Sequence, residues 1–327
     1  MATSPPRSVS PIGKTGLEVT RLGLGGAPLG GLFESVREAE ARATLAAAYG
    51  AGIRYFDTAP FYGHGRGEMR IGAFLRERPR GEFVLSTKVG RVLVPAVGQV
   101  EDRHYKDVLP LNPVFDFSAD GIRRSFESSL ERLGLERVDI LLVHDPDAHY
   151  RTVLDQAFPA LARLREEGAI RAIGAGMNQW EMLRDFARHA DFDCFLLAGR
   201  YTLLDQSALP ELLPLCEERR IAILLGGPYN SGVLAGGGHY DYEAVSPAIL
   251  EKVRRLEIVA SRHGVPLKAA ALQFPLAHPS VATVIPGART AAEVEDNVRM
   301  FSHPIQPGFW NELREERLLP EEAPVPD

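Results

Sequence analysis

The sequence predicts an α/β protein, a (β/α)8 TIM barrel with an N-terminal β-hairpin and long loops at the C-terminal rim. Eight short apolar segments alternate with segments of helical periodicity, and this alternation requires a parallel sheet with helical crossovers. An open doubly wound sheet fits the same alternation. The closed barrel is favoured because the eight units follow one another without a break in composition, and 327 residues exceed only moderately the roughly 250 of a typical barrel.

The first predicted elements are a hairpin, a strand and one helix–strand unit. In "SPIGKTGLEVTRLGLGG" apolar and polar residues alternate on both sides of a Lys-Thr-Gly turn, which leads into a strand near Leu22 to Leu24. Helical periodicity over residues 37–52 ends at Gly50 and Gly52. The next segment, "IRYFDT", is short, apolar and rich in aromatic residues, as expected for a buried strand.

The same alternation continues to the end of the chain. Further helices are predicted at residues 67–78, 118–134, 151–168, 179–190, 208–220, 246–264, 267–277 and 291–301. Further strands are predicted at residues 83–89, 138–145, 169–177, 193–200, 221–227 and 281–287. The stretches 90–117 and 226–244 would be long loops at the functional rim. We expect residues 1–327 to form a single domain, with 1–10 and about 319–327 flexible.

Composition and charge exclude several classes of protein. Hydrophobic residues make up 45% and charged residues 24% of the chain, which fits a soluble globular protein and not a disordered one. The net charge of −6 and the scattered basic residues indicate neither a nucleic-acid partner nor an anionic membrane. No signal peptide or membrane-spanning run is seen, and the two cysteines, Cys194 and Cys216, are expected to be packing residues. A cytoplasmic location is therefore expected.

Four polar residues fall where barrel enzymes carry their chemistry, at the ends of neighbouring strands. Asp57 ends the second predicted strand, Tyr62 lies in the loop beyond it, Lys88 ends the third strand and His144 the fourth. Taken singly, each has an ordinary structural interpretation, such as a core ion pair, a loop contact or a satisfied histidine. Their combination at one rim favours an active site.

Other kinds of site fit the sequence less well. The glycines of "GHGRGE" follow the second strand and not the first, and neither they nor "LGLGGAPLGG" match a dinucleotide fingerprint or a P-loop. His64, His144 and His149 lack the spacing of metal ligands, so no metal is expected. No G-x-S-x-G motif supports a serine triad.

The residues around these four groups resemble the aldo-keto reductase superfamily. The resemblance rests on "FDTAPFYG", "STKVG", "LLVHDPD", "GAGMN" and "IPGARTAAEVEDN", and it spans nearly the whole chain. It implies an eight-stranded barrel that binds an extended nicotinamide dinucleotide without a Rossmann domain. It also implies that Tyr62 is the acid/base, that Lys88 lowers the tyrosine pKa from about 10, that Asp57 positions Lys88 and that His144 polarises the substrate oxygen.

The resemblance further implies a set of cofactor ligands. Asn178 matches a ligand of the nicotinamide amide, the loop Gly226 to Gly232 matches a pyrophosphate strap, and the adenosine end falls at Arg289 and Asn297. The strap residues assigned to cofactor binding are Gly227, Pro228, Asn230, Ser231 and Gly232. The alternatives are that Asn178 caps the following helix, that Asn297 ties down its own helix, and that the glycines serve only the turn.

Some positions depart from the family pattern. Met177, Ala198 and Gly226 stand where many relatives have Ser, Gln and an aromatic residue, so no stacking partner for nicotinamide is assigned. Near the adenosine end, Glu293 lies close to Arg289 where relatives that prefer NADP carry basic residues. Because a carboxylate repels a 2′-phosphate, NAD is favoured over NADP.

Finer motifs resemble the aldose 1-dehydrogenase subgroup, which includes L-fucose, D-threo-aldose and L-galactose dehydrogenases and pyridoxal 4-dehydrogenase. The motifs are "HDPDAHY", "GGPYNSGVLAGG" and "IPGAR". The substrate would then be a cyclic hemiacetal oxidised to a lactone, or pyridoxal. An NADPH-dependent carbonyl reductase and a regulatory nucleotide-binding barrel remain alternatives, and a homodimer is one allowed assembly. Phe61, Trp180 and Tyr229, with Trp310 as a further option, are candidate aromatic contacts to substrate.

Overall fold

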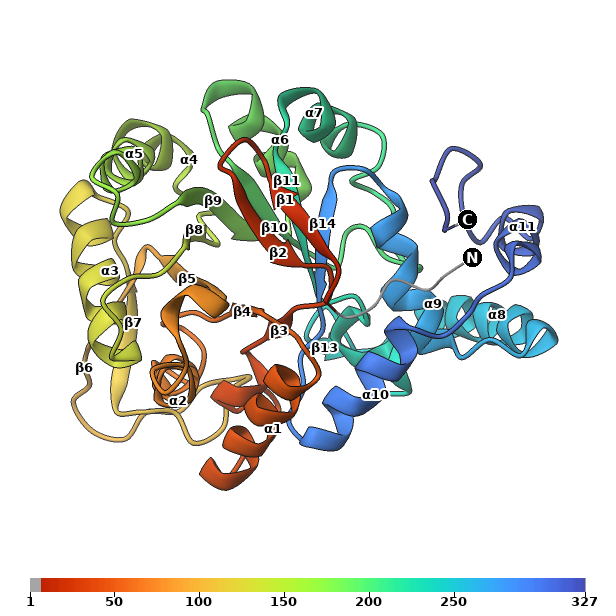
Figure 1. Ribbon diagram of the computed structural model, residues 1–327, viewed down its shortest axis with the longest axis horizontal. Helices are drawn as coiled ribbons and strands as arrows, with labels where there is room; N and C mark the ends of the chain where they lie inside the picture. The colour runs from red at the N-terminus through yellow and green to blue at the C-terminus, as the bar shows by residue number, and fades with distance from the viewer. Residues whose placement is uncertain (1–6, 327) are drawn as a thin grey trace.

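The computed structural model describes residues 7–326 and forms a nearly closed barrel of eight parallel strands (Figure 1). Around the barrel the strands are β3 (Leu24–Gly25), β4 (Tyr55–Asp57), β5 (Val84–Val89), β8 (Ile140–His144), β9 (Ala172–Met177), β10 (Cys194–Ala198), β11 (Ala222–Gly226) and β14 (Val281–Ile285). The first and last strands meet through the parallel bridges Leu22 to Val284 and Gly25 to Gly287. The predicted closed barrel is therefore confirmed over the open sheet, and all eight predicted strands are present.

Helices form the outer layer, as the crossovers between parallel strands require. They are α1 (Glu38–Gly50), α2 (Arg66–Leu75), α3 (Ala119–Leu133), α4 (Tyr150–Thr152), α5 (Phe158–Glu166), α6 (Trp180–His189), α7 (Leu212–Arg219), α8 (Pro247–His263), α9 (Leu267–Gln273), α10 (Ala291–Phe301) and α11 (Pro307–Glu315). Three helices, α3, α8 and α10, begin at side-chain caps that satisfy free backbone N–H groups: Ser118 accepts from Gly121, Ser246 from Ile249 and Thr290 from Glu293.

The hydrophobic core has two parts. The larger part lies between the strands and the helices, and the smaller part lies inside the barrel. The hairpin of β1 (Val9–Ile12) and β2 (Leu17–Thr20) inserts Ile12, Leu17 and Val19 into the inner part, against residues at the beginnings of the strands. The hairpin therefore covers the N-terminal end of the barrel and leaves the C-terminal end for the polar groups.

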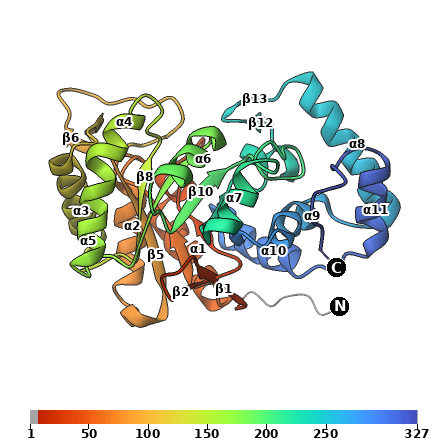
Figure 2. The ribbon, with the colours of Figure 1, turned by 90° about the horizontal axis from the view of Figure 1, so that it is seen from above.

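The two long loops at the opposite end contain hairpins that the sequence did not predict. One consists of β6 (Arg91–Pro95) and β7 (Leu111–Phe115), and the other of β12 (His239–Tyr240) and β13 (Glu243–Ala244). Figure 2 shows β6, β12 and β13 on the side of the molecule opposite β1 and β2. These loops rise from the C-terminal rim, as predicted, and form the walls of a site there.

The expectation of flexible chain ends fails for several residues. Val9 and Ser10 pair with β2, and at the other end Leu319 and Ala323 are buried. Arg314 donates a hydrogen bond to the carbonyl of Ala323, which holds the tail against α11. Residues 1–6 and 327, which belong to the same expectation, lie outside the described residues. Between residues 7 and 326, no helix combines the length and apolar character that crossing a bilayer requires.

Candidate active site

Neighbouring strands bring the four predicted catalytic residues to the C-terminal rim. Asp57 is the last residue of β4 and His144 the last of β8, while Lys88 is the penultimate residue of β5, which lies between them. Tyr62 comes from the loop between β4 and α2, and its hydroxyl turns back toward Lys88. The strand order therefore explains why residues from three separate units meet.

Lys88 is the centre of a buried hydrogen-bond network. Its ammonium group donates to Asp57 Oδ2 at 2.7 Å, to the Thr58 carbonyl at 3.0 Å and to Tyr62 Oη at 2.9 Å. These three bonds use all the donors of an ammonium group. Lys88 is only 1% exposed, so the ion pair with Asp57 is shielded from solvent and its geometry is fixed.

The network continues behind Asp57 into the barrel. Ser86 Oγ donates to Asp57 Oδ1 at 2.7 Å, and the hydroxyl groups of Ser86 and Tyr55 are hydrogen-bonded at 2.9 Å. Both residues are fully buried. Neither Ser86 nor Tyr55 was predicted as a site residue, although the alternation of β5 places Ser86 and Lys88 on the same face of the strand.

The pKa of Tyr62 is raised well above its ordinary value, contrary to the sequence expectation. Burial is the main cause because it disfavours the phenolate, and the negative charge of Asp57 raises the pKa further. Asp57 also offsets the positive charge of Lys88, with which it forms a contact pair. Tyr62 is therefore a neutral phenol near pH 7, and it is hydrogen-bonded to an ammonium group that would stabilise its anion.

His144 is neutral near pH 7. Burial and the nearby positive charges of Arg91 and Lys88 hold its pKa well below the ordinary value. Its ring lies edge-on to that of Tyr62, with the centroids 5.9 Å apart. Nδ1 has no hydrogen-bond partner among the described residues. A neutral imidazole carries one N–H donor and one acceptor, so His144 can orient a small polar molecule beside Tyr62.

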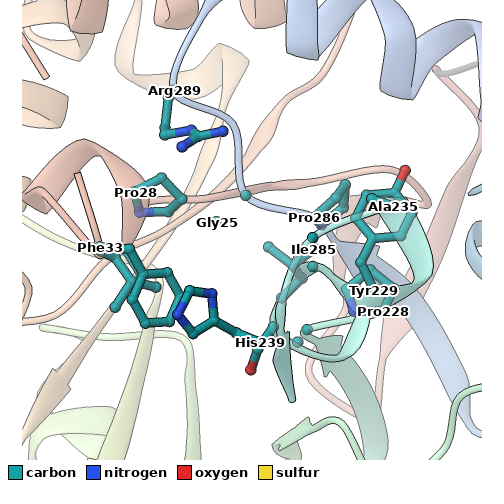
Figure 3. Close-up of a pocket in the computed structure, with 18 of the residues that line it drawn as sticks. Gly25, Pro28, Phe33, Pro228, Tyr229, Ala235, His239, Ile285, Pro286 and Arg289 are labelled. Carbon is teal, nitrogen blue, oxygen red and sulfur yellow. The ribbon is translucent and has the colours of Figure 1, made fainter. Parts of the chain in front are cut away.

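Two adjoining cavities open at this rim. The larger has a volume of about 550 Å3 and the smaller about 210 Å3. The larger cavity is drawn in Figure 3, where Phe33 and His239 lie ring against ring at its edge and Arg289 stands at another side. Tyr62 lines both cavities, whereas His144 and Lys88 line only the smaller one. Tyr62 therefore lies at the junction of the two cavities.

The larger cavity has the size and the open backbone that a cofactor site requires. A Cβ atom built at Gly227 would come no closer than 3.8 Å to other protein atoms, one at Gly232 no closer than 4.0 Å, and one at Gly238 would have no protein atom within 4 Å. Missing side chains at these positions leave room for a ligand against the backbone, and the cavity size is ordinary for a cofactor site. Most of the predicted cofactor residues line it: Gly227, Pro228, Ser231, Gly232, Arg289 and Asn297. Asn178 lines the smaller cavity instead.

Asn230 differs from its prediction. It is 2% exposed and does not line either cavity. Its Nδ2 donates to the Gly199 carbonyl at 3.1 Å. Asn230 has φ +46° and Ser231 φ +57°, so the strap contains a left-handed turn that the Asn230 side chain ties to the loop after β10. Its role in the strap is therefore to hold the loop and not to contact a ligand in this cavity.

Three of the four candidate substrate aromatics, namely Trp180, Tyr229 and Trp310, do not line the smaller cavity. Tyr229 lines the larger cavity and donates to Asn297 Oδ1 at 2.8 Å, so it lies beside the predicted cofactor residues. Trp180 packs on the core and lies 5.4 Å from the Arg184 guanidinium, away from both cavities. Trp310 is 1% exposed and packs against Phe309. Phe61 alone lines the smaller cavity.

The structure adds residues that the sequence analysis missed. Tyr105 and Tyr242 line the smaller cavity, and the Tyr105 ring stacks 6.0 Å from that of Tyr62. Both come from the long rim loops, which have no periodicity that could have placed them. Of the positions that depart from the family pattern, Met177 lines the smaller cavity, Gly226 the larger and Ala198 both. Asp145, next to His144, also lines the smaller cavity.

The fold and the rim site define a barrel enzyme with a dinucleotide-sized groove beside a buried acid/base group. The model of the Aldo/keto reductase family matches residues 21–317, so the chain belongs to this family and is an oxidoreductase. Aldo-keto reductases use NAD or NADP. Pyridoxal 4-dehydrogenase of Microbacterium luteolum is 42% identical, over 94% of this chain and 97% of its own. D-threo-aldose 1-dehydrogenase of a Pseudomonas species is also 42% identical, over 93% and 96%.

Other relatives are more distant. L-galactose dehydrogenase of Arabidopsis thaliana is 31% identical, over 88% of this chain and 86% of its own. Among solved structures, the holo form of an aldo-keto reductase from Bacillus halodurans superimposes with a TM-score of 0.77. It covers 98% of both chains at 23% identity, so this similarity supports the fold alone.

Proposed function

We propose that this protein oxidises the anomeric carbon of an aldose hemiacetal to a lactone, with NAD as the preferred hydride acceptor. The observation that carries the proposal is the position of Tyr62, which is held by Lys88 at 2.9 Å and lines both the groove and the smaller cavity. A proton-transfer group at this junction can act on the oxygen of a substrate while the carbon that carries this oxygen faces the cofactor. The aldose class is supported by the 42% identical aldose 1-dehydrogenase.

The proposed roles follow from the contacts. During oxidation the substrate O–H bond breaks and its proton passes to the Tyr62 phenolate. The C–H bond on the same carbon also breaks, its electron pair leaves with the hydrogen as hydride, and a carbonyl group forms. A bound nicotinamide ring supplies the acceptor for this hydride. Lys88 stabilises the negative charge on Tyr62, and Asp57 holds Lys88 in place. The neutral His144 orients the substrate oxygen.

The preference for NAD is supported by the charges around Arg289. Glu34 Oε2 lies 2.6 Å from its guanidinium and Glu293 Oε1 lies 2.9 Å away, so two carboxylates share one positive charge. Arg289 lines the groove together with both glutamates. A 2′-phosphate would meet a region with an excess of negative charge, and like charges repel. Glu293→Gln should therefore improve the kcat/KM for NADP more than that for NAD.

A panel of substrates tests the proposal. L-Fucose, L-galactose, D-arabinose, L-xylose and pyridoxal are incubated separately with NAD and with NADP, and the absorbance of the reduced cofactor is followed. We expect the highest kcat/KM for an aldose with NAD. Reduction of simple aldehydes with NADPH, without oxidation of any substrate in the panel, would contradict the proposed function. Nucleotide binding without any turnover would also contradict it.

Pyridoxal is the second candidate substrate. The smaller cavity is lined by the rings of Phe61, Tyr105 and Tyr242, which suit a flat aromatic ring as well as the apolar face of a sugar. A relative named pyridoxal 4-dehydrogenase is 42% identical to this chain. The panel separates the two candidates by their kcat/KM values, because it holds both classes at equal concentration.

Three further expectations remain part of the proposal. The chain would act as a single domain, since one hydrophobic core surrounds the barrel and receives residues from both α1 and α11. It would be cytoplasmic, which subcellular fractionation of the source cells tests. A homodimer is the assembly we would look for first, and light scattering measures its mass directly.

A further inference from the structure

Asp145 lines the smaller cavity and carries a carboxylate group that the proposed chemistry does not use. Its side chain is 29% exposed and lines this cavity. Oδ2 accepts a hydrogen bond from Arg91 Nη2 at 2.6 Å, while Oδ1 has no hydrogen bond within residues 7–326. Among the described residues, Asp145 is the only carboxylate on the wall of this cavity. A partly buried carboxylate with one free oxygen is a strong acceptor for a ligand hydroxyl group.

The position of this carboxylate is fixed by the backbone and by Arg91. Asp145 has φ +42°, and its N–H donates to the Gly176 carbonyl at 3.0 Å, which extends the contact between β8 and β9 by one residue. The Arg91 guanidinium lies 4.2 Å from the ring centroid of Phe61 and 4.9 Å from that of Phe115. Because two rings hold the guanidinium, Asp145 cannot turn away without breaking the ion pair.

Supporting His144 is the competing role for Asp145. Oδ2 lies 3.5 Å from His144 Nε2, which is longer than an ordinary N–H···O hydrogen bond. The same oxygen already accepts from Arg91, whereas Oδ1 accepts from no described residue. The ion pair with Arg91 uses Oδ2 and leaves Oδ1 available to a ligand. These contacts favour a role toward the substrate.

The distance between the two side chains indicates which part of a substrate would reach Asp145. If His144 Nε2 holds the oxygen on the reacting carbon, the Asp145 carboxylate, whose Oδ2 lies 3.5 Å from that nitrogen, is within reach of a group on the neighbouring carbon. Most of the other lining residues of the cavity are apolar or aromatic, including Leu32, Phe61, Met177 and Leu196. A hydroxyl group next to the reacting carbon would therefore have Asp145 as its acceptor.

We propose that Asp145, positioned by Arg91, accepts a hydrogen bond from a substrate hydroxyl group on the carbon next to the reacting carbon. The substrate class is then narrowed to 2-hydroxy aldoses in their hemiacetal form, and simple aldehydes and 2-deoxy sugars are poor substrates. This inference rests on the proposed function. It assigns Asp145 to specificity and Arg91 to positioning, and it leaves proton transfer to Tyr62.

The test compares Asp145→Asn with wild type on an aldose and on its 2-deoxy analogue. An uncharged amide is a weaker acceptor than a carboxylate, so kcat/KM for the 2-hydroxy sugar should fall by about tenfold or more. The value for the 2-deoxy sugar should change by less than about threefold, because it forms no such bond. Arg91→Lys should also lower kcat/KM for the 2-hydroxy sugar more than kcat/KM for the 2-deoxy sugar. Asp147→Asn, two residues on with an exposed side chain, is the matched control and should affect neither.

The outcomes separate this inference from the proposed function. An equal loss on both sugars would mean that Asp145 serves His144, and it would overturn the inference. The inference would also be overturned if the wild-type protein oxidised the 2-hydroxy and the 2-deoxy sugar equally well. This comparison needs no variant, so it tests the inference even if Asp145→Asn fails to fold. A wild-type protein that oxidised neither sugar would overturn the proposed function, and the inference with it.

Discussion

At the residue scale, the site is a chain of buried polar groups in which each member has a defined partner. The chain runs from Tyr62 through Lys88, Asp57 and Ser86 to Tyr55. A fully satisfied network in a medium of low dielectric constant holds its members in one geometry, whereas a gap in it leaves an unpaired buried group. Acid/base chemistry at Tyr62 therefore depends on residues that never touch a substrate.

The raised pKa of Tyr62 gives a pH dependence whose sign differs between the two reaction directions. Oxidation needs the phenolate, and because the pKa is raised the phenolate fraction increases with pH throughout the neutral and mildly alkaline range. Reduction needs the phenol, which is already fully populated there. We expect kcat for oxidation to rise with pH and kcat for reduction to stay level, both measured by cofactor absorbance.

A variant without the hydroxyl group is the control for this pH dependence. Tyr62→Phe keeps the ring that stacks on Tyr105 but removes the acid/base group. Its rate should fall by about 10²- to 10⁴-fold, and the residual activity should lose the slope with pH. A Phe variant of near-normal rate, or an oxidation rate that peaked below neutral pH, would show that another group carries the proton.

Ser86→Ala tests the part of the network behind Asp57. The substitution removes the donor to Asp57 Oδ1 and a partner of Tyr55 Oη, both fully buried. The free energy of unfolding should fall by about 1–3 kcal/mol, measured by urea denaturation. The kcat should fall as well, with little change in KM. Ser125→Ala is the matched control, because the buried Ser125 hydroxyl group has no hydrogen-bond partner among the described residues.

At the element scale, all eight barrel strands could be predicted from the sequence because periodicity and strand-end position are local signals. The same signals placed Asp57, Lys88 and His144 at one rim, since parallel strands end on the same side of a barrel. They could not show where a side chain beyond the end of a strand points. Trp180 therefore looked like a rim contact, although it packs on the core, and Tyr105 was missed because only a long loop carries it to Tyr62.

The contact between α2 and α3 depends on a missing side chain. A Cβ atom at Gly72 in α2 would lie 2.1 Å from the Leu133 carbonyl oxygen at the end of α3, so Gly72→Ala must push the helices apart. Overpacking of this kind should lower the free energy of unfolding by about 1–3 kcal/mol, measured by urea denaturation.

Gly50, the last residue of α1, is the control for this helix contact. A Cβ atom there would meet no protein atom within 4 Å, so Gly50→Ala should be neutral or stabilise the protein by up to about 1 kcal/mol through helix propensity. If the two variants were equally stable, close packing of α2 on α3 would not be the reason for glycine at position 72.

At the scale of the whole molecule, three rim loops from different strands meet above the groove. The Phe33 N–H donates to the His104 carbonyl at 2.7 Å, and Leu32 forms an antiparallel bridge with Tyr105. The Phe33 ring stacks on His239 with the centroids 4.5 Å apart and the planes within 8° (Figure 3). The loop after β3 thus contacts both the loop after β5 and the loop after β11.

The stack of Phe33 on His239 joins two loops that line the larger cavity, and we predict that a dinucleotide opens it on entering and on leaving. An aromatic pair of this kind contributes about 0.5–1.5 kcal/mol beyond its buried area. Phe33→Ala should therefore speed both association and dissociation of NADH by up to about tenfold, while the Kd changes much less because the stack opposes both steps. Stopped-flow measurement of NADH fluorescence gives the two rates. Val97→Ala, at a fully exposed position in the loop between β6 and β7, should change neither rate. Unchanged rates in Phe33→Ala would mean that the nucleotide enters without parting these loops, and that the stack only stabilises the rim.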